Sequence, residues 1–259
     1  KVTMYKNSPK SLVLAGAFSI ATLLSVSSNA TIVEFETSQG NFKINLHDQT
    51  TPTTVENFLK YINDGDFNNT VVHRLVPNFI MQAGGFEFNG NFPLTAIDVD
   101  SSIKNEPLYS NVRATVAMAK VGNSPNSATS QWFINYKDNS ANLDIQNGGF
   151  TVFGEVIEGM DNIDKIAQLP ICQSIPMPDY TDEQCANSNF VPADENFVTI
   201  RAVTISNSST TTAESLSPVK NTLINQESSS SDSSGGGSLS YFALLTLSLV
   251  GLRRKMKIS

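Results

Sequence analysis

Residues 72–86 read Val-His-Arg-Leu-Val-Pro-Asn-Phe-Ile-Met-Gln-Ala-Gly-Gly-Phe. The stretch holds short apolar runs that are interrupted by Pro77 and closed by Gly84. Apolar runs of this length between turn-forming residues are typical of β-strands. The stretch therefore predicts strands joined by turns.

The same pattern continues on both sides of this stretch. Residues 32–46 predict a hairpin, because Phe42, Ile44 and Leu46 alternate with polar residues after a turn at residues 38–41. Further strands are expected at residues 71–72, 79–81, 115–119, 131–134, 151–156 and 197–205. Many strands and few helices favour a closed barrel.

Two helices are expected among these strands. The first begins after Thr51, presents one apolar face and ends at Gly65. Its first turn is capped either by Thr51 or by a capping box of Thr53 and Glu56. The second helix covers residues 160–168.

The stretch at 72–86 resembles the signature of the cyclophilin-type peptidyl-prolyl cis-trans isomerases, in which a His-Arg pair runs into Pro-Gly-Phe-x-x-Gln-Gly-Gly. A second block matches in order and spacing, with residues 117–119 before 130–134 and residues 143–144 before 152–154. The match is closest to exported bacterial members and covers residues 31–206. It implies a mainly β fold, an eight-stranded antiparallel barrel capped by two α-helices.

Residue by residue, the resemblance implies a catalytic group and a proline pocket. Arg74 matches the catalytic arginine, although by itself it would be read as a surface residue paired with an acid. Gln82 matches a glutamine that contacts the substrate and orients the arginine, Phe79 completes the catalytic set, and His73 is a supporting neighbour. The remaining substrate-binding positions are Ile80, Ala119, Gln131, Phe133, Leu143 and Phe150.

These residue types suit the reaction that the resemblance implies. Rotation about an X-Pro bond faces a barrier of about 18–20 kcal/mol because it breaks amide conjugation. An arginine is always charged and offers several hydrogen-bond donors, so it can stabilise the pyramidal nitrogen of the twisted peptide. No metal, nucleotide or organic cofactor is expected.

Several positions depart from the family pattern. Asn142 replaces the tryptophan of cyclosporin-sensitive members, which predicts weak cyclosporin binding, and the segment 170–192 is enlarged. Other changes touch the site or its surroundings, and two of them replace glycines near Phe79 and predict a slightly different loop there. They are Lys120 for asparagine, Phe150 for histidine, Trp132 for phenylalanine, and Asn78 and Ala83 for glycine.

The charge distribution and the few histidines and cysteines limit the classes of ligand that the chain is expected to bind. Seven of the 17 lysine and arginine residues lie in the first ten or last seven positions, while all 24 acidic residues lie between them. The acidic centre would repel phosphate, so nucleic-acid binding is not expected. With His47 and His73 as the only histidines, a zinc site is not expected either. Cys172 and Cys185 form a disulfide in an oxidising compartment or remain two free thiols.

The N-terminus predicts a signal peptide over residues 1–30. Lys6 and Lys10 precede the uncharged residues 11–28, and Ser28-Asn29-Ala30 fits the small-x-small cleavage rule. The mature chain is then expected to begin at Thr31. The alternative is a retained membrane anchor.

The C-terminus predicts a linker rich in Ser, Thr and Gly (residues 207–237) and a hydrophobic tail with a basic end (residues 238–259). The tail resembles the GlyGly-CTERM sorting tails of Gram-negative bacteria, which a rhomboid-class intramembrane protease cuts near the glycines. Its apolar run of about 14 residues is short of the roughly 20 that span a bilayer. The resemblance implies transient inner-membrane insertion and an exported protein that is periplasmic, at the cell surface or secreted after both ends are processed. A plain anchor is the alternative.

Three functions remain open at this level. The first is an isomerase that assists the folding of exported proteins. The second is a module that binds proline-containing segments with little turnover, and the third is a surface scaffold. Intact Arg74, Phe79 and Gln82 favour the enzyme, because binding alone would not need the arginine. A monomer is the expected state, since no oligomerisation pattern is present.

Overall fold

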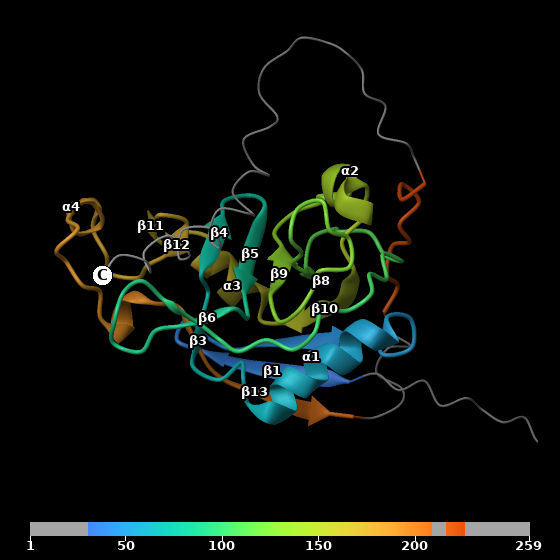
Figure 1. Cartoon of the computed structure of the whole chain (residues 1–259), viewed down its shortest axis with the longest axis horizontal. Coiled ribbons are helices and arrows are strands. Elements are labelled where there is room, and N and C mark those ends of the chain that lie inside the picture. Colours follow the sequence, from blue (N-terminus) through green and yellow to red (C-terminus); the bar gives the residue numbers. More distant parts are fainter. Residues whose placement is uncertain (1–30, 209–215, 226–259) are drawn as a thin grey trace, which may run out of the picture.

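The fold was analysed in a computed structural model, which describes residues 31–208 and 216–225 (Figure 1). The expected signal peptide (residues 1–30) and the expected hydrophobic tail (residues 238–259) lie outside these ranges. Within the described ranges, no helix has the length and hydrophobicity needed to cross a membrane.

One curled antiparallel sheet dominates the molecule (Figure 1). Its strands follow the spatial order β4-β5-β9-β8-β10-β2-β1-β13-β3-β6-β7. Their bounds are β1 Ile32–Thr37, β2 Phe42–Leu46, β3 Thr70–Val71, β4 Arg74–Val76, β5 Ile80–Ala83, β6 Phe86–Glu87, β7 Thr95–Ala96, β8 Thr115–Met118, β9 Trp132–Asn135, β10 Val152–Glu158 and β13 Thr199–Asn207. The expected mainly β class and the hairpin at residues 32–46 are confirmed.

The sheet closes into a ring through residues 70–76. Strand β3 pairs with β13 and β4 pairs with β5, and only Val72 and His73 separate β3 from β4. The backbone N–H of Val72 donates to Val198, and that of His73 donates to Gln82. If β3 and β4 are counted as one bent strand, the ring consists of β1, β2, β3/β4, β5, β8, β9, β10 and β13, which is the expected eight. The short β6 and β7 add to the count outside this ring.

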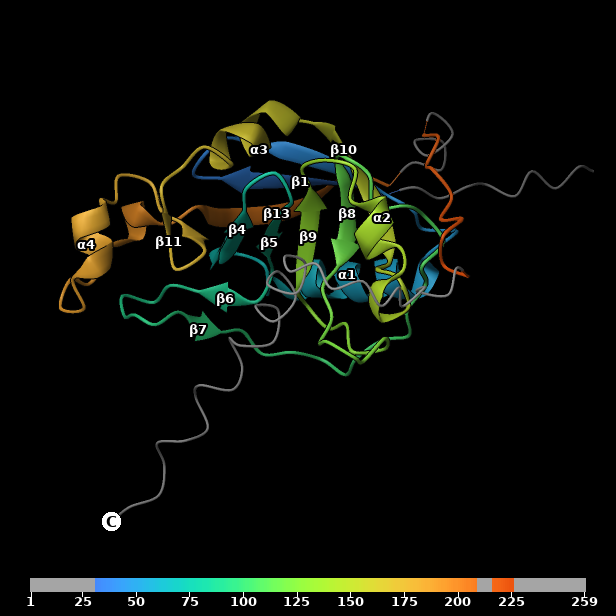
Figure 2. The same ribbon diagram turned by 90° about the horizontal axis from the view of Figure 1, so that it is seen from above.

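The two expected helices lie on opposite sides of the barrel (Figure 2). They are α1 (Pro52–Asp64) and α3 (Met160–Ile166), and α1 turns Val55, Phe58 and Ile62 into the core. Smaller elements are α2 (Ser140–Leu143), α4 (Asp182–Ala186), the 3₁₀ turns at Gln146–Gly148 and Asp194–Asn196, and a hairpin of β11 (Ile171–Cys172) and β12 (Ile175–Pro176).

The start of α1 differs from both expected caps. The Thr51 hydroxyl donates to the carbonyl of His47 and caps nothing in the helix. Instead the carboxylate of Glu106 accepts from the backbone N–H groups of Thr53, at 3.3 Å, and Thr54, at 2.9 Å. A carboxylate at a helix N-terminus satisfies free N–H groups and complements the helix dipole. The expected end at Gly65 is confirmed, with the left-handed φ of 81° that glycine allows.

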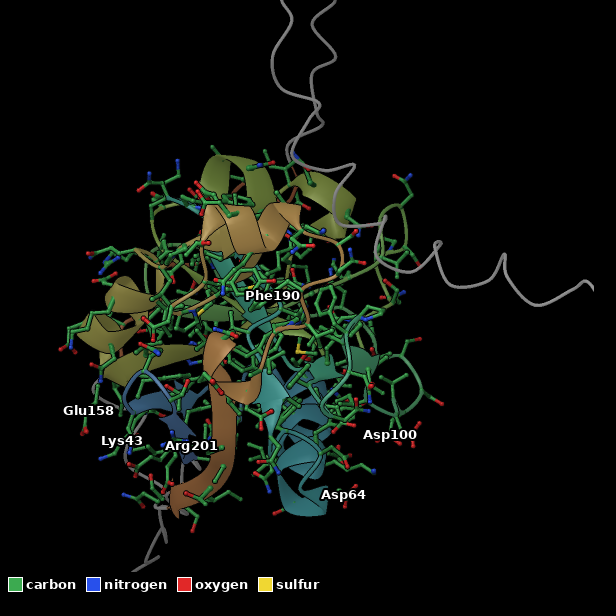
Figure 3. The ribbon with its side chains drawn as sticks, turned by 90° about the vertical axis from the view of Figure 1, so that its left-hand side faces the viewer. Lys43, Asp64, Asp100, Glu158, Phe190 and Arg201 are labelled. Atoms are coloured by element: carbon green, nitrogen blue, oxygen red, sulfur yellow. A yellow bond between two sulfur atoms is a disulfide. The ribbon has the colours of Figure 1, made fainter. Side chains whose placement is uncertain are left out.

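The enlarged segment 170–192 packs against one end of the barrel (Figure 3). A disulfide joins Cys172 of β11 to Cys185 of α4, which decides between the two alternatives left open by the sequence. The β11–β12 hairpin covers the otherwise free edge of β4, where the Leu75 N–H donates to the carbonyl of Ser174 at 2.6 Å. An edge strand that is covered in this way offers no template for aggregation.

Candidate active site

The pairing register of the four neighbouring strands β4, β5, β9 and β8 shows which residues face the site and which face the barrel interior. Arg74 on β4 lies opposite Gln82 on β5, Gln82 opposite Phe133 on β9, and Phe133 opposite Ala117 on β8. Residues directly opposite in an antiparallel sheet share a face. The alternate positions, such as Leu75, Met81 and Ile134, belong to the interior cluster. The barrel therefore presents Arg74, Gln82 and Phe133 as one row on its other face.

An apolar cluster adjoins this row and contains most of the residues that the resemblance assigns to a proline pocket. Phe133 and Phe150 meet edge to face with ring centroids 5.8 Å apart, and Phe150 is tied to Leu143 by a 2.9 Å backbone hydrogen bond. Phe79 is half-buried at the edge. The other members are Ile80, Tyr109, Ala117, Ala119, Val152 and Val76. The structure thus brings the expected pocket residues together and adds Tyr109, which lay in no recognised motif.

A chain of polar side chains runs beside the pocket. The Arg74 guanidinium donates to Oε1 of Gln82 at 3.3 Å, and Nε2 of Gln82 donates to Oε1 of Gln131 at 2.8 Å. Gly85 leaves the room for this chain, because a Cβ there would lie 2.7 Å from the Gln131 side chain. The guanidinium is therefore held by a neutral amide.

The charge of Arg74 is buried, and the described part of the chain supplies no counter-ion for it. The residue is 7% exposed, and burial lowers the pKa of its guanidinium, which nevertheless remains charged. No carboxylate among the described residues lies within ion-pair distance of it. Only one of its five N–H donors is committed to a described side chain. The alternative of a surface arginine paired with an acid does not match this arrangement.

His73 lies next to this site rather than in the pocket cluster. Its ring packs edge to face on Phe86 with centroids 4.8 Å apart. Burial lowers the pKa of His73 to about 4, although the neighbouring Gln131 acts in the opposite direction. The imidazole is therefore neutral near pH 7, and neither of its ring nitrogens has a hydrogen-bond partner among the described residues.

The loop that carries Phe79 is held by asparagines. Asn78 adopts a left-handed φ of 55°, which asparagine tolerates better than most residues. The carbonyl of Phe79 accepts from the Tyr136 N–H at 2.9 Å and from the Asn139 amide at 3.0 Å. A hollow of about 450 Å³ beside Phe79 is bordered by Asn142, the position at which the cyclosporin-sensitive relatives carry tryptophan.

Two departures from the family pattern lie away from the pocket. Ala83 and Trp132 are cross-strand partners on the interior face of the barrel. The Trp132 ring lies over Gly84, where a Cβ would approach it to 2.7 Å. Ala83 therefore affects the packing of the barrel interior. From the sequence it was instead expected to alter the loop around Phe79.

Two other departures contact each other at the pocket wall. The Lys120 ammonium lies 4.7 Å from the centre of the Phe150 ring. It also donates to the carbonyls of Asn147 at 2.9 Å and Gly149 at 2.6 Å. Lys120 is 5% exposed, and burial lowers its pKa to about 8. Lysine over an aromatic ring is a favourable cation–π arrangement, so the two substitutions form one structural unit.

Comparisons with known proteins agree with this geometry. The family model "Cyclophilin type peptidyl-prolyl cis-trans isomerase/CLD" matches residues 32–186. A peptidyl-prolyl cis-trans isomerase of Acinetobacter baylyi is 43% identical over 141 residues, which are 54% of this chain and 73% of the relative. Peptidyl-prolyl cis-trans isomerase B of Escherichia coli is 40% identical over 139 residues, 52% of this chain and 83% of the relative.

Solved structures show the same fold. A cyclophilin-type isomerase of Cryptosporidium parvum superposes with a TM-score of 0.51 at 23% identity, covering 69% of this chain and 98% of that one. A second structure of that protein, obtained in the presence of the dipeptide Ala-Pro, gives a TM-score of 0.50 at 22% identity, covering 68% of this chain and 99% of that one. The chain belongs to the cyclophilin-type peptidyl-prolyl cis-trans isomerase family, and its activity is the cis–trans isomerisation of X-Pro peptide bonds.

Proposed function

We propose that this isomerase acts on proline-containing segments of exported proteins, and that Arg74 is its catalytic residue. The observation that carries the proposal is the buried guanidinium of Arg74, which Gln82 orients at 3.3 Å beside the apolar cluster of Phe79, Phe133 and Leu143. A proline ring suits the apolar cluster, and the uncommitted N–H donors suit the amide nitrogen beside it.

The catalytic step requires no covalent bond. As the X-Pro bond twists, its nitrogen becomes pyramidal and regains a lone pair, which accepts a hydrogen bond from the Arg74 guanidinium. This interaction is absent in the planar cis and trans states, so it lowers the barrier without trapping either of them. In a site that excludes water, a charged donor stabilises the transition state more strongly than it would at the protein surface, because the local dielectric constant is lower.

The location outside the cytoplasm is supported by the two ends of the chain. Residues 1–30 have the pattern of a cleaved signal peptide, and residues 235–259 combine three glycines, a short apolar run and a basic end. The Cys172–Cys185 disulfide suits an oxidising compartment. Fractionation of cells that express the tagged full chain tests the location: recovery in the cytoplasm alone would contradict it.

A binding module with little turnover is the second candidate. It is favoured by Phe150, which keeps the apolar wall but lacks the donor of the histidine that many relatives carry there. Such a module would hold proline segments through the same pocket and would not depend on Arg74.

The deciding experiment compares wild-type protein with Arg74→Ala in the isomerisation of an X-Pro tetrapeptide. Arg201→Ala is the matched control, because Arg201 is exposed and has no described ion pair (Figure 3). Arg74→Ala should lose at least about 10²-fold in kcat/KM, the usual effect of deleting one donor to the transition state, and should still bind peptide. Unchanged turnover in Arg74→Ala would remove Arg74 from the mechanism.

A further inference from the structure

Residues 216–225 lie within the expected linker, yet they return to the barrel and bind it. We call them the strap. In both Figure 1 and Figure 2 the strap runs along the end of the barrel opposite α4. Lys220 forms an antiparallel bridge with Tyr109. The Ser110 N–H donates to Val219 at 2.8 Å, and the Asn221 N–H donates to Leu108 at 2.9 Å.

Asn221 ties the strap to a second part of the barrel. Its side-chain amide donates to the carbonyl of Asp144 at 3.0 Å. Its side-chain oxygen accepts from the N–H groups of Leu223, at 2.9 Å, and Ile224, at 3.0 Å. This turn directs Ile224 onto the backbone of Gly149, where an added Cβ would lie 2.9 Å from the Ile224 Cδ1 atom.

The strap's contacts are the outer supports of the pocket wall. Tyr109 is itself a member of the pocket cluster, and Asp144 directly follows Leu143 of that cluster. Gly149 precedes Phe150 and accepts from the buried Lys120. Lys120 therefore binds the segment 144–150, which we call the pocket wall, from one side, and the strap binds it from the other.

Side chains inside the wall join these supports into one network. The Asn111 amide donates to Oδ1 of Asp144 at 3.0 Å and to the carbonyl of Phe150 at 3.2 Å. The Asn105 amide donates to the carbonyl of Gly149 at 2.8 Å. A displacement of either loop, 105–111 or 144–150, is thus transmitted to Phe150.

We propose that the strap is a positioning element of the isomerase site, so that the functional unit includes residues 216–225 and does not stop at the last barrel strand. The proposal rests on the assignment of the pocket as the proline site. Residues 216–225 lie beyond the part matched by the family model, which ends at residue 186. Because the strap is tethered close to the end of β13, its effective concentration is high, and a few hydrogen bonds suffice to keep it bound.

The test uses the full chain with single substitutions in the strap. Asn221→Ala removes the bond to Asp144 and the turn, and Ile224→Ala removes the contact with Gly149. Thr222→Ala is the matched control, since Thr222 is exposed and makes no described hydrogen bond. Kinetic constants for an X-Pro tetrapeptide and amide hydrogen exchange of residues 105–111 and 143–150 are measured for each variant.

Asn221→Ala and Ile224→Ala should each raise KM about threefold to tenfold, as expected for lost hydrogen bonds and packing, with kcat nearly unchanged. Exchange should accelerate in both loops, and Thr222→Ala should behave as wild type. Faster exchange with unchanged KM would show that the wall does not depend on the strap for function. Unchanged exchange would show that the strap does not hold the wall; either result overturns the proposal. Arg74→Ala, measured in parallel, reports separately on the assignment of the site.

Discussion

Two buried cations lie at the two ends of the strand row that carries the pocket. Arg74, on β4, is 7% exposed, and Lys120, just after β8, is 5% exposed. Neither has a described carboxylate within ion-pair distance. Lys120 donates to two backbone carbonyls and covers the Phe150 ring, whereas Arg74 donates to one side-chain amide.

This difference is the one expected between a structural charge and the catalytic charge proposed for Arg74. An unpaired buried charge is costly, so the chain must gain from retaining it. Lys120 uses its donors on the protein and stabilises the pocket wall. Within the described residues, most donors of Arg74 remain uncommitted beside the apolar cluster, which is the arrangement expected of a group reserved for substrate.

The sharpest test of this comparison is Arg74→Lys, which retains the charge and removes the planar fork of donors. If geometry matters as well as charge, kcat/KM should fall about 10²-fold, equivalent to about 2.7 kcal/mol of transition-state stabilisation. Lys120→Arg is the reciprocal variant and should lose far less. An Arg74→Lys enzyme with nearly full activity would mean that a positive charge alone is sufficient.

Gln82→Ala should have the next largest effect. It removes the acceptor that orients Arg74 and the donor to Gln131, so we expect kcat to fall about tenfold. Thermal unfolding should show that the variant is folded, and the exposed Gln168→Ala serves as the control. Wild-type kcat in Gln82→Ala would show that β4 alone orients the guanidinium.

Lys120→Met should reduce turnover only a few-fold, because the aliphatic stem still packs on Phe150. Its effect on stability depends on pH. Burial lowers the pKa of Lys120 from 10.5 to about 8, so the folded protein carries a penalty below about pH 8 that disappears as the pH rises towards 10.5. The unfolding free energy of the wild type should therefore rise over this interval relative to Lys120→Met. The exposed Lys104→Met should show no such trend; a flat difference for Lys120→Met would contradict the burial of its charge.

Removing the disulfide should have the smallest effect on turnover. With Cys172 and Cys185 replaced by serine, denaturant unfolding should show a loss of about 3 kcal/mol, as expected for a short closed loop. Turnover should stay within about twofold, because Gln82 rather than the loop orients Arg74. A larger loss would show that the contact between Ser174 and Leu75 also positions Arg74 through β4.

Much of the site was predictable because its residues lie in short motifs. Arg74, Phe79, Ile80 and Gln82 fall within one stretch. Arg74 on β4 and Ile80 and Gln82 on β5 alternate onto one face of the sheet, and Phe79 lies in the loop just before β5. Residues whose role depends on a distant partner were not predictable. Glu106 caps α1 across 52 positions, from Thr54, and nothing near either residue indicates this contact.

The other contacts that the sequence did not predict also join residues that are distant along the chain. Tyr109, from the loop before β8, packs in the same apolar cluster as Phe150, and Asn221 binds Asp144 across 77 positions. Lys120 and Phe150 each depart from the family pattern, but only the fold shows that the Lys120 ammonium lies over the Phe150 ring. Periodicity and turn residues report on neighbours in the chain, and such contacts lie outside their range.

The sequence by itself predicted most of the barrel strands and the two main helices, because hydrophobic alternation and turn residues are local properties. The candidate catalytic residues followed from the resemblance of one short stretch to a family signature, which is also local. Tertiary structure alone decided how the ring closes through residues 70–76, that Cys172 pairs with Cys185, and that residues 216–225 bind the pocket wall. These outcomes depend on which distant surfaces meet when the barrel packs. Burial and hydrogen-bond geometry between distant segments set them, and neither is encoded in any single stretch of the chain.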